Sequence, residues 1–200
     1  MHATRSTGRL PWPIRDELGA EARRVYDRIV DGPRARLTGP AAVMDGDGRL
    51  LGPFNAMLAS PAVGDAQQQL GAAIRYGTSL PDRLRELAIL TVAAHRDSDF
   101  ERHAHTDPAR AAGLTDEDLA AIDAGGEALT GPDAVIHRAV IVLLSDRDLD
   151  DESFEAVQDL LGTTGTVELV VLVGYYDLLA LSMRAFRVPR PASLSRNGND

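Results

Sequence analysis

Apolar residues recur every three or four positions along most of this chain, a spacing typical of amphipathic α-helices. The pattern predicts a helix over residues 16–30, which Gly32-Pro33 would end. Prolines suited to a first helical turn begin two more, over 53–60 and 61–76. Further helices are predicted over 81–96, 98–112, 115–124, 131–145 and 150–161. Because β signals are weak throughout, the predicted fold class is all-α, with about eight helices.

A final helix is predicted over residues 164–187, and it is apolar on nearly every side. A helix with apolar residues all round is expected to be buried all round. Glu168, Asp177 and Arg184 interrupt it too often for a membrane span. We therefore predict a central core helix, a subunit interface or both, and no membrane partner.

The 200 residues fit one helical domain, placed over residues 16–190. Residues 1–15 contain Gly8, Pro11 and Pro13 and are predicted to form an extended arm whose Trp12 packs onto the core or a partner. Residues 191–200 are polar and predicted to be a flexible tail. The first residues lack the charged start and apolar core of a secretory signal, so a cytoplasmic protein is expected.

Two residue types are missing, and each absence excludes a kind of chemistry. The chain has no cysteine, which rules out thiol redox cycling, disulfides and Cys-based zinc sites. It has no lysine either, so no ε-amine can form a Schiff base with a carbonyl substrate. The formal net charge of −9 disfavours binding to nucleic acid.

Most of the candidate chemistry lies between residues 83 and 105. Glu101 and His105 are four residues apart on one predicted helix, which places their side chains on the same face. Glu86 lies on the preceding helix of the hairpin, and a rise of 1.5 Å per residue puts it within roughly 5 Å of the height of His105. By helical angle, His95 points away from Glu86 and His103 points away from His105. The trio Glu86, Glu101 and His105 is equipped for proton transfer.

Structural roles compete with this interpretation. Ser98-Asp-Phe-Glu101 is a good capping box, and we favour a cap for Ser98. Glu86 could instead pair with Arg83 or Arg85. Tyr175 could orient a substrate oxygen, although core packing is the simpler role for it and still more for Tyr176. His137 is interpreted as a core or helix-surface residue.

The same region resembles the carboxymuconolactone decarboxylase family, which shares its fold with alkylhydroperoxidase D. The resemblance is carried by Leu80-Pro-Asp-Arg-Leu-Arg-Glu-Leu-Ala-Ile-Leu, Asp99-Phe-Glu-Arg-His-Ala-His and Ala109-Arg-Ala-Ala-Gly-Leu-Thr, and it extends more loosely over residues 16–190. It implies an alkylhydroperoxidase D-like helical bundle in a longer, single-domain member. It also implies a homo-oligomer, commonly a trimer or hexamer, although a dimer is also possible.

In the peroxidase branch of this family a glutamate, a Cys-x-x-Cys pair and a histidine reduce peroxide. Glu86 and His105 match that glutamate and histidine, while Ser98 and Glu101 stand where the two cysteines would be. Thiol peroxidase activity is therefore not expected, because neither a hydroxyl nor a carboxylate can cycle through a disulfide. In the decarboxylase branch, which requires no metal or organic cofactor, an aromatic residue usually follows the second glutamate; here that residue is Arg102. Arg102 either faces solvent, which we favour, or offers a fork for a carboxylated substrate.

The leading hypothesis is a cofactor-independent lyase or isomerase acting on a small carboxylated or lactone substrate. In it His105, Glu101 and Glu86 are catalytic, and Tyr175, Arg102 and Ser98 contact substrate. An imidazole with an ordinary pKa near ~6.5 suits protonation of an enolate. One alternative is a metal-dependent enzyme that uses the Glu/Glu/His set. Another is a non-catalytic oligomeric binding protein on the same scaffold.

Overall fold

A computed structural model describes residues 8–38 and 43–188, and it confirms the predicted all-α class. Within these ranges the only β pairing is an isolated bridge between Met44 and Leu50. The described residues form two compact units: unit 1 contains residues 8–38, 43–76 and 181–188, and unit 2 contains Gly77–Ala180. The single domain expected over 16–190 therefore stays a prediction. The predicted tail, 191–200, lies outside the described residues.

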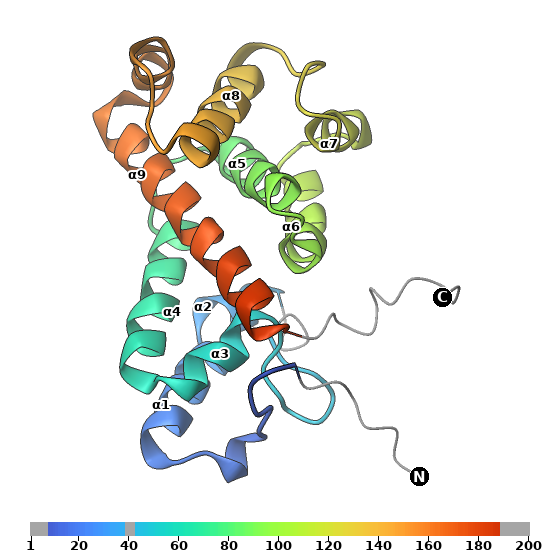
Figure 1. Cartoon of the computed structure of the whole chain (residues 1–200), viewed down its shortest axis with the longest axis vertical. Coiled ribbons are helices and arrows are strands. Elements are labelled where there is room, and N and C mark those ends of the chain that lie inside the picture. The colour runs from blue at the N-terminus through green and yellow to red at the C-terminus, as the bar shows by residue number, and fades with distance from the viewer. Residues whose placement is uncertain (1–7, 39–42, 189–200) are drawn as a thin grey trace. The chain divides into compact units, whose positions relative to one another are not determined.

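The first helices of the chain lie in unit 1, the next four lie in unit 2, and the last helix belongs to both (Figure 1). Unit 1 holds the 3-10 helix η1 (Arg15–Glu17), α1 (Ala20–Val30), α2 (Pro33–Thr38), α3 (Pro53–Ala59) and α4 (Pro61–Tyr76). Unit 2 holds α5 (Asp82–His95), α6 (Asp99–Ala111), α7 (Asp116–Asp123) and α8 (Gly131–Asp146). The last helix, α9 (Asp151–Phe186), begins in unit 2 and ends in unit 1.

The start of the first predicted helix is wrong. Instead of one helix from residue 16, the chain makes η1, becomes extended at Leu18 and begins α1 only after Gly19. The arm before it packs onto unit 1 as expected, because the Trp12 indole donates a 2.7 Å hydrogen bond to the Leu50 carbonyl. That carbonyl belongs to a short hairpin, in which Met44 pairs with Leu50 across a turn.

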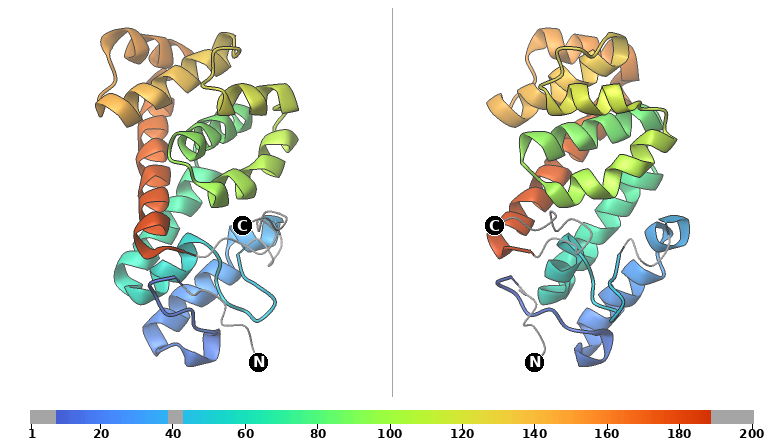
Figure 2. Two further views of the ribbon diagram at one scale, coloured as in Figure 1. Left: turned by 45° about the vertical axis from the view of Figure 1, so that its right-hand side comes forward. Right: turned by 90° about the vertical axis from the view of Figure 1, so that its right-hand side faces the viewer.

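The central helix of unit 2 is α5. Leu87, Ala88, Ile89 and Leu90 are fully buried, which means that α5 has neighbours on every side. The neighbours are α6, α7 and α8, and α5 and α6 run alongside each other in both views of Figure 2. The hairpin predicted to carry the candidate chemistry therefore forms the core of unit 2.

Arg83 ties three of these helices together. Its guanidinium donates to Asp118 on α7, to Asp133 on α8 and to the carbonyl of Gly113. The two carboxylates raise the pKa of Arg83. The Thr115 backbone N–H and Arg83 together lower the pKa of Asp118. This ion-pair network fixes the start of α5, one turn before Glu86.

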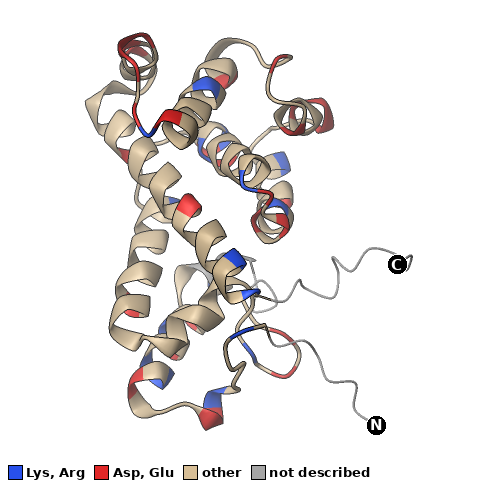
Figure 3. Cartoon of the chain, viewed as in Figure 1, with Lys and Arg blue, Asp and Glu red and all other residues tan. Residues whose placement is uncertain are grey.

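The prediction that the last helix is buried all round is wrong. α9 buries one side, including Leu169, Leu172 and Tyr176, but its opposite side leaves Val167 and Leu178 exposed. Gly162, with φ 67° and ψ 177°, breaks it where the sequence predicts two separate helices. Figure 3 shows long uncharged stretches of α9.

By length and composition α9 could also cross a membrane, since its most apolar window has a mean hydropathy of 1.6. The core helix of a soluble protein passes the same test, and 39% of that window is buried within the protein. This is weak evidence for a membrane span, and the expected lack of a membrane partner stays a prediction.

Candidate active site

Glu86 and His105 meet in the interior of unit 2. Oε2 of Glu86, one turn into α5, lies 2.6 Å from Nδ1 of His105, in the middle of α6. Glu86 and His105 are each 2% exposed and Glu101 is 4% exposed. A short contact between a carboxylate and an imidazole in a dry interior is a strong, charge-assisted hydrogen bond. The predicted meeting of α5 and α6 at these side chains is confirmed.

Glu101 approaches the other nitrogen of the same ring. Its Oε2 lies 3.5 Å from Nε2 of His105, the i,i+4 neighbour expected from the sequence. The favoured capping box is wrong, since the Ser98 side chain accepts no cap hydrogen bond although Ser98 occupies the N-cap position. Glu101 is buried and faces the imidazole. The Glu101 carboxylate therefore belongs to the buried cluster around His105.

Arg85 supplies a positive charge beside the trio. Its Nε lies 3.8 Å from Oε1 of Glu86, and its side chain is mostly buried. Glu86 thus makes both contacts that the sequence offered as alternatives, one with His105 and one with Arg85. Arg85 also donates a 2.8 Å hydrogen bond to Asp82, so two carboxylates share its charge. A proton held between His105 and Glu101 would offset the charge of the second buried carboxylate, and an uncompensated buried charge is the costly state.

Tyr176 is the member of the site that sequence reasoning missed. Its hydroxyl lies 3.3 Å from Nε2 of His105. The two rings meet edge to face, with centroids 5.3 Å apart and planes at 87°. Tyr176 was interpreted as a packing residue, while Tyr175 was assigned to substrate. Tyr175 is also buried and touches Tyr176 edge-on at 5.5 Å, so the tyrosine pair was identified but not the member that contacts His105.

The other two residues predicted to contact substrate lie apart from the imidazole contacts. Arg102 is half-buried, and its guanidinium binds the Asp123 carboxylate on α7 at an exposed position, so it offers no free fork. Ser98 is half-buried at the start of α6. Contact of Ser98, Arg102 or Tyr175 with a substrate remains a prediction.

Three histidines lie outside the site, as the sequence predicts. His95 and His103 are exposed on α5 and α6. His137 is buried on α8, and that burial lowers its pKa. A Cβ added to Gly126 would lie 2.2 Å from a ring carbon of His137. The imidazole of His137 is therefore a packed core group.

The trio is not arranged as a metal site. Glu86 and Glu101 approach opposite nitrogens of the His105 ring, so no single ion could bind all three side chains through that ring. More generally, across residues 8–38 and 43–188 no group of three or more His, Asp or Glu side chains is placed to hold a metal ion. This geometry gives no support to the Glu/Glu/His metal hypothesis.

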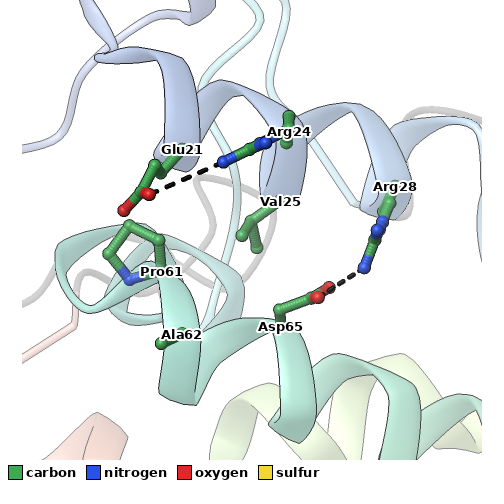
Figure 4. A pocket seen from close by; sticks show the side chains of 7 residues that line it. All are labelled: Glu21, Arg24, Val25, Arg28, Pro61, Ala62 and Asp65. Carbon is green, nitrogen blue, oxygen red and sulfur yellow. Dashed lines mark hydrogen bonds and ion pairs between the residues drawn. The ribbon is translucent and has the colours of Figure 1, made fainter.

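A separate hollow lies in unit 1 between α1 and α4 (Figure 4). Val25, Pro61 and Ala62 form its apolar part, and Arg28 bridges to Asp65 at its edge. Hydrogen bonds from Gln68 and Arg28 outweigh partial burial and lower the pKa of Asp65. The charged side chains at its edge pair with one another, so this hollow offers no chemistry comparable to that of the buried trio.

Taken together, the fold and the site define an all-α, cysteine-free protein with a buried carboxylate–imidazole–phenol cluster. Residues 61–142 match the sequence model of the carboxymuconolactone decarboxylase family. The match spans the segment that carries Glu86, Glu101 and His105, and the predicted resemblance is confirmed. Tyr176 lies outside the matched residues.

Two solved structures share the fold. One is the alkylhydroperoxidase AhpD core of an uncharacterised peroxidase-related protein from Ralstonia eutropha JMP134, with a TM-score of 0.70, 13% identity and 94% of each chain covered. The other is a protein of unknown function from Agrobacterium tumefaciens, named as a candidate AhpD antioxidant defence protein. Its TM-score is 0.60 at 20% identity, over 70% of this chain and 99% of that one. No curated protein matches the sequence. These likenesses confirm the alkylhydroperoxidase D-like fold.

Proposed function

We propose that this protein is a cofactor-independent lyase or isomerase of the carboxymuconolactone decarboxylase type. Its substrate would be a small carboxylated or lactone molecule whose reaction passes through an enolate. The observation that carries the proposal is the buried contact between Glu86 and His105, 2.6 Å long, with Glu101 and Tyr176 at the far nitrogen. Such a cluster can store one proton and deliver it without metal or thiol.

Each residue has a distinct task in this proposal. Glu86 orients the imidazole by accepting from Nδ1–H, and Arg85 balances the charge of Glu86. His105 holds the mobile proton, and Glu101 accepts it when the imidazole is neutral. After carbon dioxide leaves the substrate, the enolate carbon takes up this proton. Peroxide reduction through thiols is not proposed, since the chain has no cysteine.

The test is turnover of a carboxymuconolactone-type substrate by the purified protein, followed by carbon dioxide release. His105→Gln should lower kcat by at least about 10²-fold, the low end for a general acid or base. His103→Gln is the matched control, because His103 lies on the same helix and is exposed. Equal loss in both variants would reject His105 as the proton donor, and a wild-type protein that binds such molecules without turnover would favour the binding-protein alternative.

The proposal includes self-assembly through the outer side of α9. Val167, Val171, Gly174 and Leu178 repeat at spacings of four, three and four residues, and all are exposed. This is the spacing of a seam between packed helices, and a Cβ on Gly174 would meet nothing within 4 Å. The double change Val167→Glu and Val171→Glu should lower the mass measured by light scattering. Val63→Glu, an exposed site on α4, should leave that mass unchanged; a wild-type monomer would contradict self-assembly.

A further inference from the structure

The hydroxyl of Tyr176 lies at Nε2 of His105, the ring nitrogen that a substrate would otherwise contact. An imidazole has two nitrogens, and Nδ1 of His105 is held by Glu86 at 2.6 Å. The other, Nε2, faces the Tyr176 hydroxyl at 3.3 Å, with Glu101 at 3.5 Å. With Tyr176 in this position, a substrate atom cannot also take the hydrogen-bonding position on Nε2.

The direction of these hydrogen bonds follows from Glu86. With its carboxylate balanced by Arg85, Glu86 acts as an acceptor, so Nδ1 of His105 carries a proton. In the neutral ring Nε2 is then an acceptor and the phenol of Tyr176 donates to it. In the protonated ring Nε2–H donates to the phenol oxygen. The same contact therefore carries a proton either way, as in a triad where a carboxylate fixes the tautomer of a histidine.

We propose that Tyr176 makes the last proton transfer to the substrate, with His105 as the proton store behind it. This inference rests on the proposed function. The Tyr176 O–H bond breaks as a C–H bond forms at the enolate carbon, and Nε2–H of the imidazolium reprotonates the phenolate oxygen. His105 ends neutral and takes up one proton from solvent, so a substrate carboxylate plus one proton yields carbon dioxide and the protonated product. The substrate class is an acid whose loss of carbon dioxide leaves an enolate within reach of a phenol.

Two tyrosine variants and a control test this assignment with the carboxymuconolactone-type substrate. Tyr176→Phe should lower kcat by at least about 10²-fold with little change in KM, since the phenol acts in the transition state. Tyr26→Phe is the control, because it removes the 2.7 Å hydrogen bond of a buried tyrosine to the Gly48 carbonyl in unit 1. It should retain wild-type turnover. A loss in Tyr175→Phe without a loss in Tyr176→Phe would overturn the proposal.

A resting-state measurement separates a chemical role from packing. With ¹⁵N-labelled histidine, Nδ1 of His105 should carry the proton in the neutral ring, and the Nε2 resonance should shift in Tyr176→Phe. Unchanged Nε2 resonances would show that the hydroxyl does not bond the ring, which would overturn the proposal even if turnover fell. Absence of wild-type turnover would instead reject the proposed function and the transfer step with it. Normal wild-type turnover with an equally active Tyr176→Phe would reject only the role of Tyr176.

Discussion

The two nitrogens of His105 make contacts of unequal strength, and a stability experiment can test this difference without knowledge of the substrate. Glu86 makes a hydrogen bond of 2.6 Å to one nitrogen, whereas Glu101 stays at 3.5 Å from the other. A double-mutant cycle isolates each pairwise coupling if every single change only removes the contact. We therefore consider Glu86→Gln, Glu101→Gln and His105→Gln, alone and in the two pairs with His105.

The expected magnitudes follow from the contacts. A hydrogen bond to a charged group is worth about 1.5–3 kcal/mol, so the coupling between Glu86 and His105 should fall in that range. The contact between Glu101 and His105 is longer, at 3.5 Å, and their coupling should be about 0.5 kcal/mol, the low end for residues in contact. Glu86→Gln alone should cost about 2 kcal/mol, because the amide keeps the shape but removes the charge-assisted hydrogen bond to His105.

The assay is urea unfolding followed by circular dichroism, together with hydrogen exchange of the amides of α5 and α6. Hydrogen exchange measures the free energy of local opening for these two helices separately from that of unit 1. The exposed pair Arg138 and Glu152, which bond at 2.9 Å, is the control cycle and should show a coupling below about 1 kcal/mol. A coupling for Glu101 and His105 equal to or above that for Glu86 and His105 would refute the reasoning.

Three further predictions concern unit 2. Arg83→Met should destabilise the protein by about 2 kcal/mol, because it leaves partly buried carboxylates unpaired. The control Arg138→Met should cost under about 1 kcal/mol. Equal losses of stability in urea unfolding would contradict a stabilising role for the Arg83 ion-pair network. Gly126→Ala should cost about 3 kcal/mol, since its φ is +85° and the new Cβ would overlap the His137 ring. Gly125→Ala, with φ +98° and open space around the Cβ, should cost only about 1 kcal/mol, and the difference in melting temperature checks this. Because burial lowers the folded-state pKa of His137 below its ordinary 6.5, its contribution to stability is complete above that pH and is lost as the pH falls toward the lowered value. His137→Gln should flatten the acid side of the stability curve, and an unchanged curve would contradict the assignment.

Local patterns were enough to predict the helices and half of the site. Periodicity with proline and glycine punctuation placed α3 and α4 within a residue of the predicted bounds, since such signals act within one turn of the chain. The i,i+4 spacing of Glu101 and His105 likewise fixes their geometry on α6. Glu86 was within reach because α5 and α6 are consecutive and must pack as a hairpin. Each of these predictions depends only on near neighbours in sequence.

Long-range packing could not be predicted in the same way. Tyr176 lies 71 residues from His105, and only the placement of α9 in unit 2 decides whether it or Tyr175 meets the imidazole. The apolar character of the last helix predicts a central core helix, a subunit interface or both, whereas the central helix of unit 2 is α5. Arg83 and Glu86 find partners within the fold, so their helix can be central despite them. A sequence shows that a charge exists, and its partner appears only with the tertiary structure.

The residues that depart from the usual rules for helix caps and for burial of polar side chains lie together around His105. Their position suggests a reason why the cluster exists. Ser98 occupies an N-cap position without capping, Glu101 is buried against an imidazole, and Glu86 and His105 bury polar groups among fully buried aliphatic residues. Buried ion pairs are rarely the cheapest way to fill a core, since apolar residues of similar volume are often as stable or more so. Stability alone would therefore favour leucine at these positions. The proposed function accounts for this retention, because two carboxylates, an imidazole and a phenol in contact are suited to holding and moving a proton.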